Sequence, residues 1–320
     1  MEKVILKNKN LSVTILTLGA TVQNITAYGV TLTAGFDTKQ EYLNHTCYFG
    51  ALIGRTANRT GNTNQINGAI INLPLNEKGI NHLHGGNQGF DKKIWKIEEK
   101  SHTSVTLSYL SPDGEEGYPG NLNTKVTYSL TEDSLLISYN AKTDKPTWVN
   151  LTNHSYFNPF GINNKYGARL GGALISVYAD RVSTYDKNSR VIGSMPVKGT
   201  EFDLNKPYLI EHYYDHNFYL NGTEYKDFNG FNLRKAAKLS GTVNIETYTD
   251  LPCIQVYCGE FIPEGTKISG GAVIGSGSAI CFETQYEPNF QARNENVLYP
   301  EQEYISHTAY RFTKGGIEII

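Results

Sequence analysis

Apolar and polar residues alternate with a period of two along much of the chain. Residues 11–15 and 105–109 show this alternation, and residues 126–130 and 135–139 repeat it on either side of the polar segment 131–134. Alternation of this kind is typical of a β-strand with one buried face, because successive side chains point to opposite sides. Two such strands joined by a short polar segment predict a β-hairpin.

The residue composition favours the same class of structure. The 320 residues include 31 glycines, 22 tyrosines and 13 phenylalanines, which suit half-buried strands joined by tight turns. Only short stretches, such as Leu233 to Leu239, are expected to be helical. We therefore predict an all-β fold with little helix. No linker, low-complexity tract or repeat divides the sequence, so we expect a single domain over residues 1–320 with two large packed sheets.

Charge and hydrophobicity limit the partners of the protein. The formal net charge is −2, which provides no electrostatic attraction for nucleic acid or for an anionic membrane surface. Residues 1–7 lack the apolar segment of a signal peptide, and no apolar run approaches the roughly 20 residues of a membrane-spanning helix. We therefore expect a cytoplasmic protein, monomeric or homodimeric, whose partner is a neutral small molecule.

The four cysteines are expected to be reduced residues of the core. Their number and spacing suit neither a disulfide framework nor a CxxC metal motif. They are Cys47, Cys253, Cys258 and Cys281.

Two glycine-bearing segments carry polar side chains that suit the hydroxyl groups of a sugar. The first ends in Asn58 and Arg59, which place an amide beside a guanidinium, with a structural turn as the alternative. In the second, residues 81–86, His82 and His84 would point to one face if the segment is a strand. A metal would need a further ligand with its own spacing, which the neighbouring sequence lacks. We therefore expect no metal, and interpret His84 as a sugar contact and His82 as a loop or core residue.

Three further segments carry ionisable side chains that suit catalysis or hydrogen bonding to a substrate. His154 lies in residues 150–158, where polar neighbours would fix its tautomer, as an acid catalyst requires. Asp215 stands among aromatic residues and can accept two hydrogen bonds from adjacent hydroxyl groups. Glu283 follows an apolar strand, where a carboxylate is costly to bury without a partner or a chemical role. We interpret Glu283 as a general base; a buried structural role for His154 and a turn role for Asp215 are the alternatives.

In this order, the polar segments resemble the galactose mutarotase (aldose 1-epimerase) family over nearly the whole chain. The matching motifs are Gly35-Phe36-Asp37, Tyr48-Phe49-Gly50, residues 54–59, His84-Gly85-Gly86, Gly89-Phe90-Asp91, Trp95, residues 116–120, residues 150–158, residues 214–217, Gln255-Val256-Tyr257 and residues 282–285. Two positions depart from the family pattern: Asn289 follows proline where the family usually has aspartate, and Thr60 replaces an apolar residue. These departures bear on substrate preference and local packing, because neither is an acid or base of the implied site.

The resemblance implies a fold and a set of residue roles. The fold is a β-supersandwich of large antiparallel sheets with an open groove on one sheet. Glu283 is implied to be the general base, His154 the general acid and His84 a second histidine beside the sugar. The implied sugar-holding groups are Asn58, Arg59, Asp215 and Gln255.

The implied reaction is the exchange of the α and β anomers of a free hexose such as D-galactose or D-glucose. The base removes the C1 hydroxyl proton while the acid protonates the ring oxygen, so the ring opens and closes again without a nucleotide or metal cofactor. The acid must be protonated, and a nearby Asp215 or Glu283 would favour the protonated form of His154. Tyr257 or Trp95 is expected to cover an apolar face of the sugar.

Three rival functions agree with parts of the sequence. A glycoside hydrolase would use Asp215 and Glu283 as paired carboxylates, although the resemblance argues against it. A carbohydrate-binding protein without turnover would not need His154 and Glu283 together. A hexose-6-phosphate 1-epimerase would add basic residues for the phosphate group, and Arg59 alone is weak support for such a site.

Overall fold

Strands dominate the computed structural model, which describes residues 1–163 and 169–316. The one α-helix in these two ranges is α1 (Lys39–Asn44), which begins with a capping box in which Thr38 and Glu41 satisfy each other's backbone amides. No helix in the described part of the chain is long and apolar enough to cross a membrane. The all-β class with little helix is therefore confirmed.

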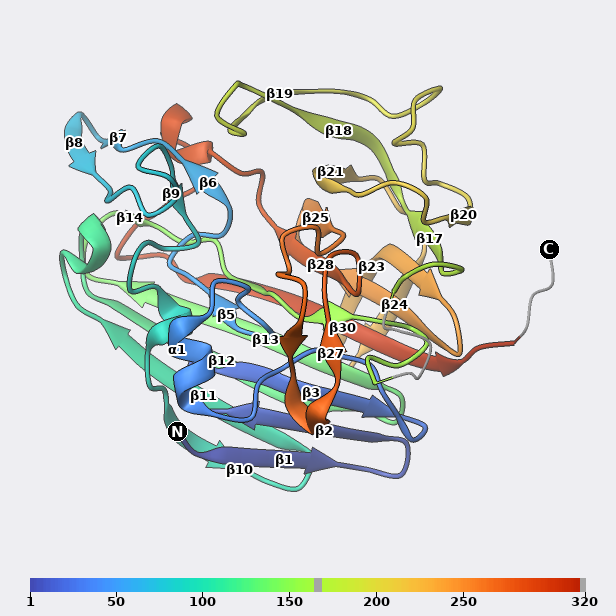
Figure 1. The fold of residues 1–320 in the computed structure, drawn as a ribbon. Coiled ribbons are helices and arrows are strands. Elements are labelled where there is room, and N and C mark those ends of the chain that lie inside the picture. Colours follow the sequence, from blue (N-terminus) through green and yellow to red (C-terminus); the bar gives the residue numbers. More distant parts are fainter. Residues whose placement is uncertain (164–168, 317–320) are drawn as a thin grey trace.

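A ten-stranded antiparallel sheet forms the larger layer (Figure 1). Its path is β10-β11-β12-β13-β30-β24-β23-β17-β20, and β22 pairs with β23 beside that path. The strands are β10 (Lys96–Lys100), β11 (Ser104–Ser111), β12 (Leu122–Leu130), β13 (Ser134–Thr143), β30 (Tyr304–Lys314), β24 (Val243–Thr249), β23 (Phe231–Ser240), β17 (Leu174–Val177), β20 (Tyr208–Leu209) and β22 (Tyr225–Phe228).

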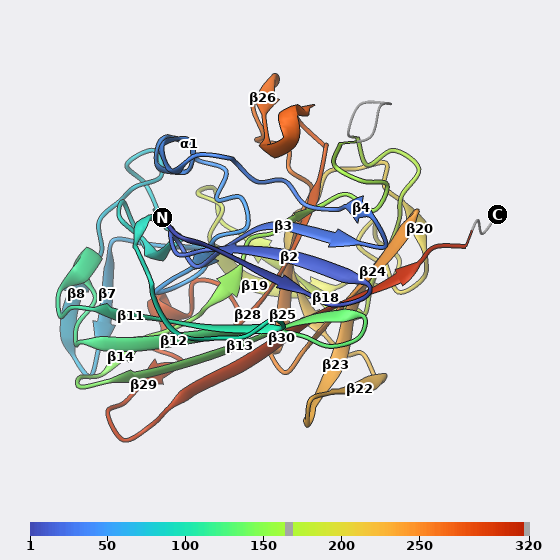
Figure 2. The ribbon, with the colours of Figure 1, turned by 90° about the horizontal axis from the view of Figure 1, so that it is seen from below.

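Two smaller antiparallel sheets complete the layers. The six-stranded sheet is ordered β16-β28-β25-β21-β18-β19, and the four-stranded sheet β1-β2-β3-β4. Their strands are β16 (Tyr156–Phe157), β28 (Ile280–Gln285), β25 (Cys253–Tyr257), β21 (Asp215–Leu220), β18 (Ala179–Tyr185), β19 (Val191–Pro196), β1 (Lys3–Lys7), β2 (Leu11–Leu16), β3 (Thr21–Ala27) and β4 (Val30–Thr31). Figure 2, seen from below, shows the four-stranded sheet beside the long strands of the largest sheet.

One apolar core lies between these sheets. It contains Val13 of β2, Ile137 of β13, Phe218 of β21 and Phe282 of β28, all of which are fully buried. Packing of this kind is that of sheets stacked face to face, in which inward side chains of each sheet interdigitate. The six-stranded sheet is therefore buried on the face that meets this core, and its other face is available for a site.

The predicted strands and the hairpin are confirmed. Residues 11–15 lie in β2 and residues 105–109 in β11, while β12 and β13 pair with Leu130 opposite Leu135. The four cysteines are confirmed as free, buried thiols.

The prediction of helix at Leu233 to Leu239 is wrong. These residues lie within β23, which pairs with β22 on one side and β24 on the other. Leucine, lysine and alanine favour helix locally, but pairing with two neighbouring strands and burial of Leu233 and Leu239 outweigh that weak preference.

Truncation of the core side chain Ile137 is expected to destabilise the fold. Ile137→Ala removes a fully buried side chain and should lower the free energy of unfolding by about 2–5 kcal/mol. The control Ile305→Ala changes a residue of β30 that is 53% exposed, and should alter stability by no more than about 0.5 kcal/mol. Urea unfolding followed by circular dichroism measures both, and equal losses would contradict the buried position of Ile137.

Candidate active site

A pocket of about 300 Å³ opens on the free face of the six-stranded sheet. This volume lies at the lower end of the range typical of small-molecule sites. The seven residues proposed from the sequence all line it: Asn58, Arg59, His84, His154, Asp215, Gln255 and Glu283. They come from positions as far apart in the chain as 58 and 283, so the fold brings them together.

The floor of the pocket is formed by side chains that lie on the same face of three neighbouring strands. Gln255 of β25 pairs directly with Glu283 of β28, and Asp215 of β21 pairs with Tyr257 of β25. Residues directly opposite each other in antiparallel strands point to the same face, as do residues two apart in one strand. The alternation of the strands therefore places Asp215, Gln255 and Glu283 side by side.

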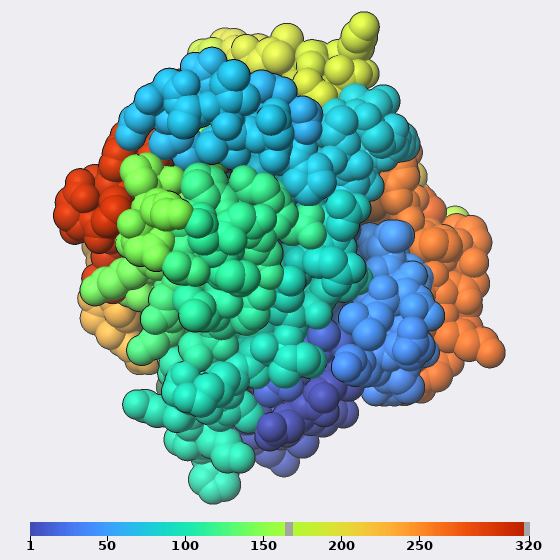
Figure 3. All heavy atoms as spheres, turned by 90° about the vertical axis from the view of Figure 1, so that its left-hand side faces the viewer, coloured from blue at the N-terminus to red at the C-terminus, as the bar shows by residue number. Residues whose placement is uncertain are grey.

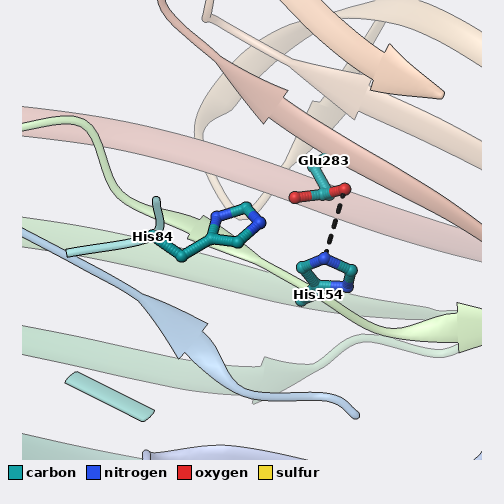
Figure 4. Close-up of side chains that lie close together, drawn as sticks. All are labelled: His84, His154 and Glu283. Atoms are coloured by element: carbon teal, nitrogen blue, oxygen red, sulfur yellow. Dashed lines mark ion pairs between the residues drawn. The ribbon is translucent and has the colours of Figure 1, made fainter. Parts of the chain in front are cut away.

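His154 lies between β15 (Thr152–Asn153) and β16, with its backbone fixed on both sides. Its N–H donates to the carbonyl of Ala51, and its carbonyl accepts from the N–H of Gly50. The imidazole Nε2 lies 3.6 Å from Oε1 of Glu283, as the dashed line in Figure 4 shows. Both side chains are almost completely buried, at 4% and 2% exposure. The two buried groups therefore lie at ion-pair distance, slightly farther apart than in a hydrogen bond.

Two tyrosine rings lie against the imidazole of His154. The ring of Tyr156 is stacked at a centroid distance of 5.0 Å and an interplanar angle of 21°, and that of Tyr48 at 5.8 Å and 24°. Both tyrosines also line the pocket. Electron-rich ring faces attract a positive charge, so this stacking reduces the cost of charging the imidazole in a buried place.

His84 has a left-handed backbone, with φ of 52°, directly after β9 (His82–Leu83). Because the chain turns there, His82 and His84 do not point to one face, and that expectation is wrong. His82 is buried against the hydroxyl of Tyr118 and the carbonyl of Pro74, which makes it a core residue, whereas His84 lines the pocket. Nδ1 of His84 accepts a hydrogen bond from the backbone N–H of Asn58 at 3.2 Å, so the neutral ring carries its proton on Nε2 and acts as a donor.

A metal was expected to lack ligands, yet three potential ligand atoms meet here. One atom each from His84, His154 and Glu283 lies within 4.8 Å of the others. A metal needs the lone pair of an imidazole nitrogen, but Nε2 of His84 carries a proton because Nδ1 is occupied by the N–H of Asn58. This donor set is therefore a poor match to a metal ion, and the absence of a metal stays a prediction.

A chain of hydrogen bonds connects the polar groups of the pocket. The amide of Asn58 donates to Gln255 at 3.0 Å, and the amide of Gln255 donates to Asp215 at 2.7 Å. The guanidinium of Arg59 lies 3.7 Å from Asp215 and binds both oxygens of Glu77 at 2.9–3.1 Å. Each group is therefore held in place by its neighbours.

Glu77 is a site residue that the sequence analysis missed. It lines the pocket and orients Arg59 through a bidentate ion pair, the strongest geometry for such a pair. No local pattern distinguishes this glutamate, because its partner lies 18 residues earlier in the chain.

Burial controls the ionisation of the two central groups. It raises the pKa of the Glu283 carboxyl well above its ordinary value, with a further contribution from the charge of Asp215. It lowers the pKa of His154 to about 3. The expectation that neighbouring carboxylates keep His154 protonated is therefore wrong, because the loss of water around the ring favours the neutral imidazole. Burial thus favours the neutral form of each group, the protonated carboxyl of Glu283 and the uncharged imidazole of His154.

The two aromatic residues expected to cover the sugar lie in different parts of the structure. Trp95 is 1% exposed and packs in the core against Phe90 and Tyr109, so it does not reach the pocket. Tyr257 does line the pocket, and the more exposed Phe261 stacks on it at 6.2 Å and 21°. Of the two aromatic residues suggested from the sequence, Tyr257 therefore lies at the pocket and Trp95 does not.

The rim of the pocket joins two segments that are remote in sequence. Figure 3 shows the blue segment around α1 next to the orange segment that carries β26 (Thr266–Lys267) and β27 (Val273–Ile274). Buried side chains of both segments, including Tyr42 and Ile262, share one apolar cluster with Tyr257. The rim is therefore anchored to the floor by apolar packing.

Solved structures identify the class of fold. The structure of an aldose epimerase homologue from C. elegans matches with a TM-score of 0.86 at 23% identity, covering 98% of this chain and 99% of that one. Galactose 1-epimerase from Lactobacillus acidophilus NCFM matches with a TM-score of 0.84 at 26% identity, covering 98% and 95%. The β-supersandwich of the galactose mutarotases is thus the fold of this chain.

Sequence comparison then identifies the family. The galactose mutarotase of Homo sapiens is 37% identical over 331 residues, which cover 98% of this chain and 94% of the relative. The sequence model of the aldose 1-epimerase family matches residues 2–311. The chain belongs to the aldose 1-epimerase family, and the resemblance found in the sequence is confirmed.

Acidification is expected to destabilise the protein through its buried histidines. Burial lowers the pKa of His82 from 6.5 to about 4. A group with a lowered folded-state pKa contributes full stability above its unfolded pKa, and that stability is lost as the pH falls toward the folded value. Between pH 6.5 and 4, His82 should therefore cost about 1.4 kcal/mol per pH unit.

Urea unfolding at several pH values measures this dependence. His82→Asn should reduce the slope of stability against pH in this window, whereas His102→Asn, at an exposed turn, should leave it unchanged. An identical slope in the His82 variant and the parent would show that His82 does not titrate as a buried group.

Proposed function

We propose that this protein is an aldose 1-epimerase that interconverts the α and β anomers of free hexoses such as D-galactose and D-glucose. The observation that carries this proposal is the buried proton-transfer pair, with Nε2 of His154 3.6 Å from Oε1 of Glu283 at the floor of a pocket lined by hydroxyl-binding groups. Membership of the aldose 1-epimerase family supports an isomerase acting on carbohydrates. In this assignment Glu283 is the general base and His154 the general acid.

The reaction requires one proton to leave and one to arrive. Loss of the proton on the C1 hydroxyl and protonation of the ring oxygen break the C1–O5 bond and give the open-chain aldehyde. Rotation about C1–C2 exposes the other face of the aldehyde, and the reverse transfers close the ring as the other anomer. Both groups return to their original protonation states, so the reaction consumes nothing.

The single proton of the pair suits this chemistry. Moving it from Glu283 to Nε2 of His154 creates a carboxylate base and an imidazolium acid without any proton from solvent. The charged form is favoured by attraction between the two groups, by the tyrosine rings beside the imidazole and by hydrogen bonds from the sugar to the carboxylate. Oε2 of Glu283 has no hydrogen-bond partner within residues 1–163 and 169–316, so it is available to the C1 hydroxyl.

The remaining pocket residues hold the sugar during ring opening. His84 donates through Nε2, and its pKa is lowered well below the ordinary value by burial, so it stays neutral near pH 7. Asn58, Gln255, Asp215 and Arg59 offer amide, carboxylate and guanidinium groups to the other hydroxyls. Holding the open chain in place keeps the aldehyde near the reacting groups, which is the general benefit of positioning.

The charges of the pocket argue for a sugar without phosphate. Arg59 is paired with Glu77 and lies close to Asp215, so its charge is largely balanced. The other basic residue in the lining is Lys78, which is exposed. A hexose 6-phosphate would need stronger compensation of its charge than one exposed lysine supplies.

We also propose a single domain and a cytoplasmic location. The apolar core that extends from β2 to β30 supports one domain over residues 1–320. Four buried free thiols support a reducing compartment. The oligomeric state, monomer or homodimer, stays a prediction.

Polarimetry tests the proposed activity directly. The protein should accelerate the approach of freshly dissolved α-D-galactose and α-D-glucose to the same final rotation that each reaches without it. Treatment with a chelator beforehand should leave the rate unchanged. An unchanged rate for both sugars would overturn the proposal, and acceleration only with hexose 6-phosphates would move the function to the phosphate-specific branch.

Removal of either proton-transfer group is expected to abolish most turnover. Glu283→Gln and His154→Asn should each lower kcat by roughly 10²–10⁴-fold while the fold is retained, because each removes an ionisable group and little volume. The controls Glu295→Gln and His102→Asn make similar changes at exposed positions and should keep the parent rate. A rate near that of the parent in either site variant would remove that residue from the mechanism.

Loss of the ion pair behind Arg59 is expected to weaken sugar binding. Glu77→Gln removes the charge that orients the guanidinium and should raise KM several-fold with little change in kcat, since Glu77 does not contact the proton-transfer pair. Initial rates over a range of galactose concentrations measure this, with Glu98→Gln at an exposed strand position as the control. A large fall in kcat at unchanged KM would mean that Glu77 acts in the chemical step instead.

A further inference from the structure

Cys281 lies directly beside the acid of the proposed reaction. It precedes Glu283 by two residues in β28, so the two side chains point to the same face of the sheet. The imidazole of His154 contacts both: its Nε2 lies 3.6 Å from Oε1 of Glu283, and its Nδ1 lies 3.4 Å from Sγ of Cys281. In Figure 4 the second ring nitrogen of His154 is turned away from Glu283. A single strand therefore contacts both nitrogens of one histidine.

The thiol of Cys281 is a neutral partner for this histidine. Its side chain is fully buried, and burial raises its pKa well above the ordinary value, with a further contribution from Glu283. A protonated thiol is both a weak donor and a weak acceptor of hydrogen bonds. It can therefore hold the ring without adding a charge to it.

The role of His154 as an acid determines whether the proton between its imidazole and the sulfur of Cys281 belongs to Nδ1 or to the sulfur. When Nε2 gives its proton to the ring oxygen, the imidazole must keep a proton on Nδ1, because a fully deprotonated imidazole is inaccessible at neutral pH. That Nδ1–H needs an acceptor in a buried place, where an unpaired donor is costly. The sulfur of Cys281 lies at the required position.

We propose that Cys281 is a positioning residue that accepts the Nδ1–H of His154 and thereby reserves Nε2 for exchange of a proton with the sugar. The chemical nature of the acceptor affects the acidity of His154, in addition to the position of that acceptor. A carboxylate at this position would stabilise the imidazolium and make it a weaker acid, whereas a neutral sulfur orients the ring and leaves its acidity high. This inference rests on the proposed role of His154 as the general acid.

Three variants of buried cysteines test the role of the thiol. Cys281→Ala removes the acceptor, and Cys281→Ser replaces it with a hydroxyl. Cys258→Ala is the matched control, because Cys258 is equally buried but belongs to the main core rather than to the cluster around His154. We expect Cys281→Ala to lower kcat by about 10-fold or more with KM within about twofold of the parent, and to shift the pH profile of kcat. Cys281→Ser should restore kcat to within about threefold, and Cys258→Ala should leave kcat and the pH profile unchanged.

Nitrogen NMR of the histidine side chains provides a readout that does not depend on turnover. The signals of His154, one of eight histidines, are identified by their loss in His154→Asn. The parent should show His154 protonated on Nδ1, and Cys281→Ala should show a mixture of tautomers. An Nε2-protonated ring in the parent, an unchanged tautomer in Cys281→Ala, or equal losses of kcat in the alanine and serine variants would each overturn the inference.

These results also separate this inference from the proposed function. A parent protein without mutarotase activity would defeat the function, whatever the tautomer of His154. An active parent whose Cys281→Ala variant keeps its kcat and pH profile would leave the function standing and defeat only the role of the thiol.

Discussion

The burial of one carboxyl group at the floor of the pocket is the constraint on which the rest of the site depends. Glu283 is 2% exposed, and its nearest ionisable partner is His154 at 3.6 Å. An isolated charge in such a place is costly, so the reaction we propose has the two groups hold one proton between them. Their separation is fixed by strand β28, which carries Glu283, and by the backbone hydrogen bonds on either side of His154.

The main features of the fold could be predicted because two-residue alternation is a direct sign of strands with one buried face. The prediction held where the pattern was long, as in β12 and β13. It failed at residues 233–239, whose helix-favouring side chains lie in a strand paired on both sides. Pairing between distant segments is a tertiary property, and no local pattern in one sequence reveals it.

The site was predictable where a residue type is unusual in its place, and hidden where a common residue acquires its role from a remote partner. Glu283 was conspicuous because a carboxylate directly follows the apolar residues 280–282 in one strand. Glu77 was not, because its role comes from the ion pair with Arg59. The protonation state of His154 was predicted wrongly because it depends on the loss of water around the ring, which only the assembled pocket determines.

The hydrogen bonds among the groups that we propose hold the sugar have a consequence for the energetics of binding. Asn58, Gln255 and Asp215 are already joined by hydrogen bonds of 2.7–3.0 Å. The hydroxyl groups of an incoming sugar must therefore replace these hydrogen bonds, because the groups are not unpaired. The net gain from each exchange is small. Loose binding of this kind costs little in an isomerase whose substrate and product differ at one carbon, because tight binding of either anomer would retard release and waste the rate gained in the chemical step.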